Sequence, residues 1–168
     1  MNIMERNQTP ERPTSIVTTK HETSWTLAVN FNIVETAEGF EYDMASIVTD
    51  HEPELRDVVN AVNNFINAKT DEKILSGFVW RENPVWLSSE NQFNFKCAYD
   101  LAYQTQGASL PATYKLGEDK DGTPIYFEFK DLETFSDFYL GCIVWIQKCI
   151  NEGWKEKDSI DYDEIMKT

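Results

Sequence analysis

The sequence lacks the apolar segments that membrane proteins and exported proteins carry. None of its 168 residues belongs to an uninterrupted apolar run of the roughly 18 or more residues that a membrane helix needs. The segment from Met1 to Asn7 has no apolar centre like that of a signal peptide. We therefore expect no membrane partner and no export from the cytoplasm.

Basic residues are also scarce. Lys and Arg number 15 against 29 Asp and Glu, which gives a formal net charge of −14. Proteins bind the phosphate backbone of nucleic acids through Lys and Arg, which release its counterions, so we expect no nucleic-acid partner. The acidic charge keeps an aromatic-rich chain soluble, and it leaves open a cationic partner or mimicry of nucleic acid.

The residues of nucleophilic catalysis are few and are not grouped. The two histidines, His21 and His51, have no Ser, Cys or second His at catalytic spacing. The motifs G-x-x-x-x-G-K, G-x-G-x-x-G and G-x-S-x-G are absent, and only seven glycines are available for phosphate-binding loops. The sequence therefore predicts no catalytic residues and a protein that is not an enzyme.

Cysteine is rare, and its spacing does not predict disulfides. Cys97, Cys142 and Cys149 are odd in number and form no C-x-x-C pair. Cys142 and Cys149 lie seven positions apart on a predicted helix, about 10 Å from each other, which is too far for a disulfide bond. We expect buried free thiols in a reducing compartment.

One acidic segment shares some features with a calcium-binding loop. Residues 117–122, with Glu128 downstream, have acidic residues at the third, fifth and twelfth positions and a glycine at the sixth. However, the first position is glycine, and the flanking residues have the pattern of strands rather than helices. The segment is therefore predicted to be a hairpin turn, and we expect neither a metal nor another cofactor.

What the sequence does contain is a repeated alternation of hairpins and amphipathic helices. In residues 25–33 every odd position is apolar, which predicts a half-buried strand, and residues 40–48 form its hairpin partner. Apolar residues then recur at helical spacing from Leu55 to Ile66. The polar residues 67–71 are predicted to break this helix.

Two more hairpins follow in the second half. Residues 74–80 and 85–87 flank a predicted turn at 81–84. Residues 112–116 and 125–129 form the other hairpin.

Each of these hairpins is followed by a helix. Ser89, with Gln92 three residues later, matches a capping box, and Asp131 is the predicted cap of the longest helix. Two sets of apolar residues define the predicted buried faces: Phe93, Cys97, Ala98, Leu101 and Ala102 on the first helix, and Leu132, Phe135, Phe138, Tyr139, Cys142, Ile143, Ile146, Cys149 and Ile150 on the second.

This order predicts an α+β fold in which antiparallel β-hairpins alternate with three amphipathic helices. We divide the chain into a flexible N-terminal arm (1–23), a hairpin-helix unit (24–69), a hairpin-helix-hairpin-helix domain (70–161) and an acidic tail (162–168). The arm is polar, holds two prolines and has no apolar periodicity. We expect it to be disordered alone or ordered only against a partner.

The tryptophans are the candidate interface residues, because Trp is a favoured anchor where proteins bind each other. Trp145 lies off the apolar stripe of its helix, so either it faces a partner or a second layer of the same chain covers it. The candidate interface consists of Trp25, Trp80, Trp86, Trp145 and Trp154.

Residues 71–161 contain a characteristic order of segments. Residues 71–74 lead to Gly77-Phe78, residues 85–87 precede a capped helix, and a short hairpin and a long helix ending at residues 157–161 follow. This pattern is similar to a domain of unknown function in tail-fibre-assembly-type and small virion-associated proteins of phages of gut Bacteroidetes. The resemblance implies a virion component or an assembly factor with no catalytic residues.

Together, these observations predict a phage virion structural or adaptor protein of the tail or head-fibre apparatus. It would act by protein–protein binding to other phage structural proteins, would be a homo-oligomer, and would reside in the virion or, during assembly, in the host cytoplasm. Two alternatives stay open: a tail-fibre assembly chaperone that is absent from the mature particle, and an acidic inhibitor that mimics DNA or blocks a host defence protein.

Overall fold

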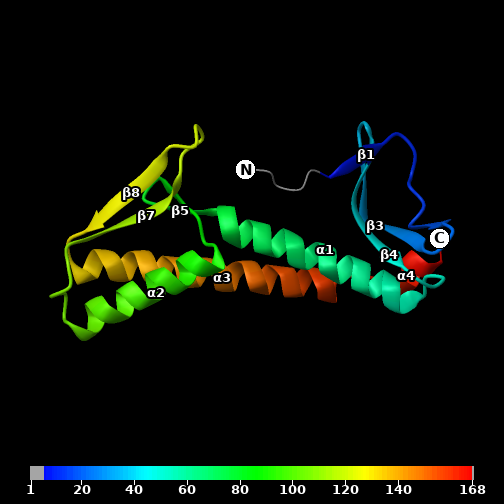
Figure 1. The fold of residues 1–168 in the computed structure, drawn as a ribbon. Helices are drawn as coiled ribbons and strands as arrows, with labels where there is room; N and C mark the ends of the chain where they lie inside the picture. The colour runs from blue at the N-terminus through cyan, green and yellow to red at the C-terminus, as the bar shows by residue number, and fades with distance from the viewer. Residues whose placement is uncertain (1–5, 168) are drawn as a thin grey trace. The chain divides into compact units, whose positions relative to one another are not determined.

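The computed structural model describes residues 6–167 and has the predicted α+β class, with helices and antiparallel sheets (Figure 1). The chain forms two compact units. The sheet unit holds the described residues up to Lys69 together with those from Gly153 on, and the hairpin unit holds Thr70–Glu152. The chain passes between the units within helix α1 (Leu55–Ser76) and again within helix α3 (Leu132–Asp158).

The sheet unit is built on four antiparallel strands in the order β1-β4-β3-β2. The central pair, β3 (Trp25–Thr36) and β4 (Gly39–Thr49), is the predicted first hairpin. The pair lies beside the first part of α1 and the short helix α4 (Tyr162–Met166) (Figure 1). Its inward side chains pack against both helices, and Asp161 caps α4. The buried residues of this core are Leu27, Val29, Phe31, Ala45, Val58, Ala61, Val62, Ile66 and Ile165.

The prediction of a flexible arm over residues 1–23 is wrong for most of its length. Strand β1 (Asn7–Thr9) pairs with β4, and strand β2 (Ile16–Lys20) pairs with β3. Both strands bind to the free edges of the central hairpin through backbone hydrogen bonds. Such bonds do not depend on alternating apolar side chains in β1 and β2. Residues 1–5 of the predicted arm lie outside the described residues.

The predicted break after the first helix is also wrong. Helix α1 continues through residues 67–71 and ends only at Ser76, so residues 74–76 are helical and not part of a strand. The polar segment contains no proline or glycine, so nothing in its backbone stops the helix. Ile74, beyond the supposed break, is buried in the core of the hairpin unit, which favours continuation.

The hairpin unit contains two separate two-stranded sheets. The first consists of β5 (Phe78–Trp80) and β6 (Asn83–Val85). Strand β5 is shorter than predicted because residues 74–76 belong to α1, and the turn is also shorter, with only Arg81 and Glu82. Both turn residues have positive φ, as a tight two-residue hairpin turn requires. The predicted turn residues Asn83 and Pro84 therefore belong to β6.

The second hairpin, β7 (Ala112–Glu118) with β8 (Pro124–Phe129), lies on one side of helices α2 (Ser89–Gln104) and α3 (Figure 1). The backbone N–H of Trp86 donates to the carbonyl of Leu116 over 2.8 Å and so connects the two hairpins. The buried residues of this core are Ile74, Trp80, Val85, Leu87, Phe95, Ala102, Leu116, Phe129, Phe135, Phe138, Cys142 and Cys149.

The prediction for helix α2 is wrong about both the cap and the buried face. The cap is Ser88, whose hydroxyl accepts the N–H of Asn91 over 3.2 Å, rather than Ser89. Phe95 and Ala102 are the buried residues of this helix. Three of the residues predicted to be buried, Phe93, Cys97 and Leu101, are exposed.

For helix α3 the prediction from the sequence agrees better with the structure than it does for α2. Asp131 caps it by accepting the N–H of Thr134 over 2.7 Å. Phe135, Phe138 and both cysteines of the predicted stripe are buried. Within residues 6–167 no helix is long and apolar enough to span a lipid bilayer.

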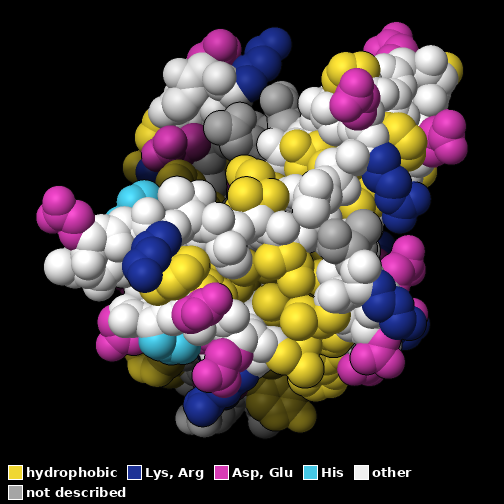
Figure 2. Space-filling model, turned by 90° about the vertical axis from the view of Figure 1, so that its right-hand side faces the viewer, with side chains coloured by type: hydrophobic (Ala, Val, Ile, Leu, Met, Phe, Trp, Pro, Cys, Tyr) yellow, Lys and Arg dark blue, Asp and Glu magenta, His cyan; other side chains and the backbone are white. Residues whose placement is uncertain are grey.

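The negative charge is divided between the two units. Residues 70–152 contain seven basic and thirteen acidic residues, a net charge of −6, and the rest of the chain contains eight and sixteen, a net charge of −8. On the face drawn in Figure 2, acidic side chains are spread over the view with basic side chains among them. The acidic residues on this face do not gather into one patch.

Candidate binding surface

His51 lies between two carboxylates at the start of α1. Its Nδ1 is 2.8 Å from an oxygen of Asp50, and its Nε2 is 3.1 Å from Oδ2 of Asp57. These hydrogen bonds raise the pKa of His51, and the one with Asp50 has the largest effect. Asp57 Oδ2 also accepts the backbone N–H of Glu54. Because both ring nitrogens are engaged, this arrangement holds the first turn of the helix and leaves no nitrogen to activate a nucleophile.

The other candidates for chemistry also have structural partners. His21 Nε2 lies 2.9 Å from Thr26 Oγ1 within the β2–β3 hairpin. In the segment that shares features with a calcium loop, Asp119 Oδ1 accepts the backbone N–H groups of Asp121 and Thr123, both over 2.9 Å. The segment is thus the predicted hairpin turn. Among residues 6–167 no three His, Cys, Asp or Glu side chains are placed to hold a metal ion together.

The cysteines are free thiols, as predicted. Cys142 and Cys149 are buried, and burial raises the pKa of Cys142 to about 12. Its thiol is therefore protonated at neutral pH and is a weak nucleophile. Cys97 is exposed, contrary to the expectation that the thiols are buried.

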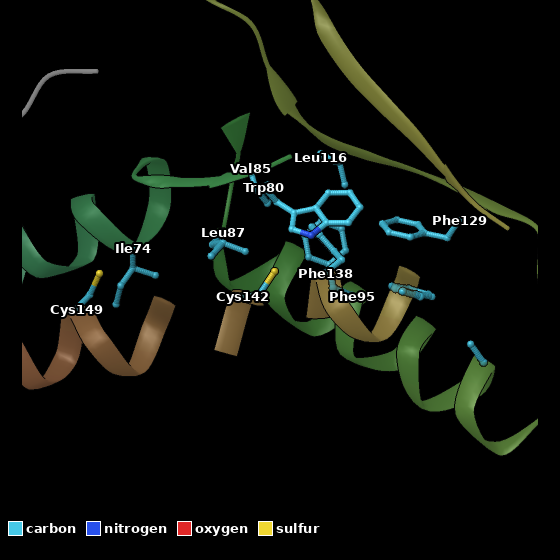
Figure 3. Close-up of a cluster of buried hydrophobic side chains, with 12 residues drawn as sticks. Ile74, Trp80, Val85, Leu87, Phe95, Leu116, Phe129, Phe138, Cys142 and Cys149 are labelled. Atoms are coloured by element: carbon cyan, nitrogen blue, oxygen red, sulfur yellow. The ribbon is translucent and has the colours of Figure 1, made fainter. Parts of the chain in front are cut away.

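Trp80 is a core residue rather than an interface residue. It is only 6% exposed, and its ring lies 4.9 Å from that of Phe127 and 5.1 Å from that of Phe138. Its indole N–H donates to Asp137 over 3.0 Å. Figure 3 shows the indole surrounded by side chains from both hairpins and from helices α2 and α3, including Leu116, Phe129 and Phe138.

Trp145 is covered by its own chain, which decides between the two alternatives that the sequence left open. Its ring stacks on Phe78 at 6.1 Å, and its N–H donates to the carbonyl of Lys73. Trp25, in the sheet unit, is half-buried, and Lys20 lies 5.3 Å from the centre of its ring. Both tryptophans are thus partly covered by groups of their own unit.

Trp86 and Trp154 remain as exposed candidates, at 43% and 60%. Trp86 follows β6 in the hairpin unit, and Trp154 belongs to the sheet unit. The structure therefore does not gather the five predicted tryptophans into one surface within either unit.

The hairpin unit does expose other apolar residues in rows on its helices. Phe93, Cys97 and Leu101 follow one another at intervals of four along α2, and Phe93 and Leu101 are more than half exposed. Leu140 and Val144 have the same spacing on α3 and are 56% and 65% exposed. Residues four apart share one face of a helix. We call these five residues the outer helical surface.

Each row lies on the side of its helix that faces away from the core. On α2 the buried residues are Phe95 and Ala102, and on α3 they include Phe138 and Cys142. The α3 row is also free of charge, because no charged residue occurs between Asp137 and Lys148. Apolar side chains arranged in this way on a chain with so many charged residues are typical of a protein-binding surface.

The sequence contained a signal for this surface that its interpretation missed. Helix α2 carries two apolar faces, one with Phe93, Cys97 and Leu101 and another with Phe95, Tyr99 and Ala102. A helix at the surface of a small unit buries one face, so one of the two had to be exposed. Tyr99 stacks on Tyr139 of α3 at 4.6 Å, and Phe95 meets Phe138 at 5.0 Å. These ring contacts select the buried face.

Comparisons with protein-family models, with curated proteins and with solved structures find no match to this chain.

Proposed function

We propose that this chain is a non-enzymatic binding protein that docks other proteins through the outer helical surface of the hairpin unit. The observation that carries the proposal is the double row of exposed apolar residues on α2 and α3. A large apolar side chain left in water forgoes roughly 1.5–3 kcal/mol of burial free energy, which a partner recovers when it covers the row. A protein-binding function accounts for the exposure of these apolar side chains.

The chemistry of the remaining candidate groups supports a binding role. His51 has both nitrogens in hydrogen bonds to carboxylates, and His21 is bonded to a threonine of its own hairpin. Cys142 is buried with a raised pKa. None of these groups is set up as a nucleophile or a general base.

We further propose that the partners are phage structural proteins and that the chain is a structural or adaptor component of a tail or head-fibre apparatus. This setting rests on the resemblance of residues 71–161 to small virion-associated phage proteins, a range that contains all of α2 and α3. The protein would reside in the particle, or in the host cytoplasm while the particle assembles. An assembly chaperone is the closely related variant.

The alternative of an acidic inhibitor finds less support. Mimicry of nucleic acid calls for carboxylates gathered along one surface. The charge is shared between both units, and the acidic side chains on the face in Figure 2 are spread over the view with basic side chains among them.

Two measurements test the proposal. Mass spectrometry of purified particles from the phage or prophage that encodes the chain should detect it at a fixed stoichiometry. In vitro, one or more purified structural proteins from the same gene cluster should bind the chain, and Phe93→Asp should weaken that binding at least about tenfold, as loss of an interface anchor does. Val48→Asp, at an exposed position of β4 in the sheet unit, is the matched control and should bind normally.

The outcomes of these measurements distinguish a virion component from an assembly chaperone. Binding to a structural protein without presence in mature particles identifies an assembly chaperone. Absence from particles together with no binding to any structural protein of the cluster would overturn the proposal. Equal binding by the Phe93→Asp variant and the wild type would exclude the α2 row as the binding surface.

A further inference from the structure

Helix α3 carries a row of exposed side chains whose chemistry changes along its length. Glu133, Asp137, Leu140, Val144 and Lys148 follow one another at intervals of three or four, and all five are exposed. At this spacing they lie along one side of the helix over about 22 Å. The row thus begins with two acidic residues, continues with two apolar residues and ends with a basic residue.

The order of charges is symmetric about the apolar pair. Asp137 lies three positions before Leu140, and Lys148 lies four positions after Val144. The residues from Phe138 to Gln147 contain no charge. Opposite charges at nearly equal distances, three and four positions, on either side of an apolar centre form a self-complementary pattern for a helix that runs in the reverse direction.

The helix dipole explains only part of this pattern. It favours an acidic residue in the first turn, which accounts for Glu133, and basic residues in the last turn. Lys148 lies about ten residues before the end of α3, beyond the reach of that effect. Its ion pair with Glu152 is long, at 4.0 Å, and such exposed pairs are weak.

Asp137 also retains bonding capacity toward a partner. Its Oδ2 accepts both the indole N–H of Trp80 and a hydrogen bond from Arg81. Its side chain is nevertheless more than half exposed. A carboxylate has two oxygens, so Asp137 can serve the fold through one of them and a partner through the other.

We propose that a second copy of this chain docks on the α3 row, with the two α3 helices antiparallel about a twofold axis. Leu140 and Val144 of each copy form the apolar centre. Asp137 of each copy then faces Lys148 of the other, so two ion pairs flank the centre. A parallel arrangement would bring like charges together. The uncharged centre matters because each copy carries a net charge of −14, so the two copies repel each other at long range.

This inference rests on the proposed function in one respect: both treat the outer helical surface as a protein-binding surface. They use different parts of it. The second copy uses the α3 row, whereas the test of the proposed function changes only Phe93 on α2.

Analytical ultracentrifugation of the purified full chain is the first test. We expect a monomer–dimer equilibrium that shifts with concentration. Val144→Glu should weaken dimerisation at least about tenfold, because it places two additional carboxylates at the centre of the interface. Lys148→Glu should weaken it as well, and high salt should reduce the difference between Lys148→Glu and the wild type. All these positions are exposed, so the variants should fold, and Val48→Glu is the matched control for an added carboxylate.

The orientation is tested by cross-linking in a Cys97→Ser background, which removes the exposed native thiol. A mixture of the Leu140→Cys and Val144→Cys variants should cross-link more readily than either variant alone, because the antiparallel pair places these positions opposite each other. The reverse preference, a chain that stays monomeric at every concentration, or a dimer unaffected by Val144→Glu would overturn the inference. A monomer that still binds phage structural proteins would leave the proposed function intact, and a dimer that binds none of them and is absent from particles would refute the proposed function alone.

Discussion

The two units of this protein have hydrophobic cores of different composition. The core of the hairpin unit is aromatic: Trp80, Phe95, Phe129, Phe135 and Phe138 are all buried, and the rings of Phe129 and Phe135 stack at 4.4 Å. The buried core of the sheet unit is mainly aliphatic and contains a single aromatic ring, that of Phe31, with Phe65 at its edge. Aromatic rings remove a large area from water per residue, so few elements suffice to enclose them.

The sheet unit instead combines its aliphatic core with a buried polar network. Asp43 is only 6% exposed and is surrounded by partners from distant parts of the sequence. Asn32 donates to it over 2.8 Å, and the cationic groups of Arg6 and Lys69 lie 3.6 and 4.0 Å away. Lys69 in turn pairs with Glu156 at 2.9 Å. A buried carboxylate needs such partners, and here they join the start of the described chain, α1 and the end of α3.

The comparison also shows where apolar surface is left uncovered. In the sheet unit the exposed large apolar residues on strands are Val17, Val34, Met44 and Val48, and the strand register places Val17, Met44 and Val48 on one face of the sheet, with polar residues such as Thr26 and Ser46 among them. In the hairpin unit Phe93 and Leu101 on α2, and Leu140 and Val144 on α3, lie in rows at helical spacing. Apolar residues among polar ones are normal on a protein surface, whereas apolar rows are typical of binding surfaces.

The largest effect is expected from truncation of the aromatic core. Phe138→Ala removes a ring that contacts Trp80, Phe95 and Phe129, and should lower the free energy of unfolding by about 3–5 kcal/mol. Hydrogen exchange followed by mass spectrometry should show faster exchange in β7 and β8 than in β3 and β4. Equal acceleration in both units would mean that they unfold as one cooperative body and would remove the distinction between the two cores.

A smaller effect is expected from the polar network of the sheet unit. Asp43→Ala leaves Arg6 and Lys69 without their shared carboxylate and should cost about 1–3 kcal/mol in urea unfolding. Glu41→Ala is the matched control, because Glu41 also pairs with Arg6, at 3.7 Å, but is more exposed. We expect the control to cost less than about 1 kcal/mol. Equal losses would contradict the importance of burial at Asp43.

The smallest effect concerns pH, and it should be confined to one unit. Both histidines lie in the sheet unit, and the pKa of His51 is raised from its ordinary value of 6.5 by its hydrogen bonds to Asp50 and Asp57. The folded state therefore binds the proton more tightly than the unfolded state. The resulting stabilisation is fully present below pH 6.5 and is lost as the pH rises through the folded-state pKa.

Thermal unfolding of the wild type and His51→Ala at several pH values between about 5 and 9 measures this contribution. The difference between the two proteins should shrink as the pH rises, and hydrogen exchange should locate the change at the start of α1. A difference that grows with pH would contradict the raised pKa of His51. A change located in β7 and β8 would show that the pH response is not confined to the sheet unit.

Much of the fold followed from local pattern. The alternation in β3 and the stripe on α3 predicted buried residues such as Leu27, Val29, Phe135 and Phe138, because these elements bury one face and their periodicity records it. The cap at Asp131 was likewise readable, since capping is a contact between residues close in sequence.

The rest depended on partners that are distant in sequence. Strands β1 and β2 carry no apolar alternation and exist because β4 and β3 offer free edges. Helix α2 has two apolar faces, and only ring packing against α3 determines which of them is buried. Trp80 and Trp145 are covered by elements that the sequence does not place around them. Periodicity thus determined most of the strands and helices, whereas long-range packing decided where the edge strands β1 and β2 form and which apolar faces remain exposed.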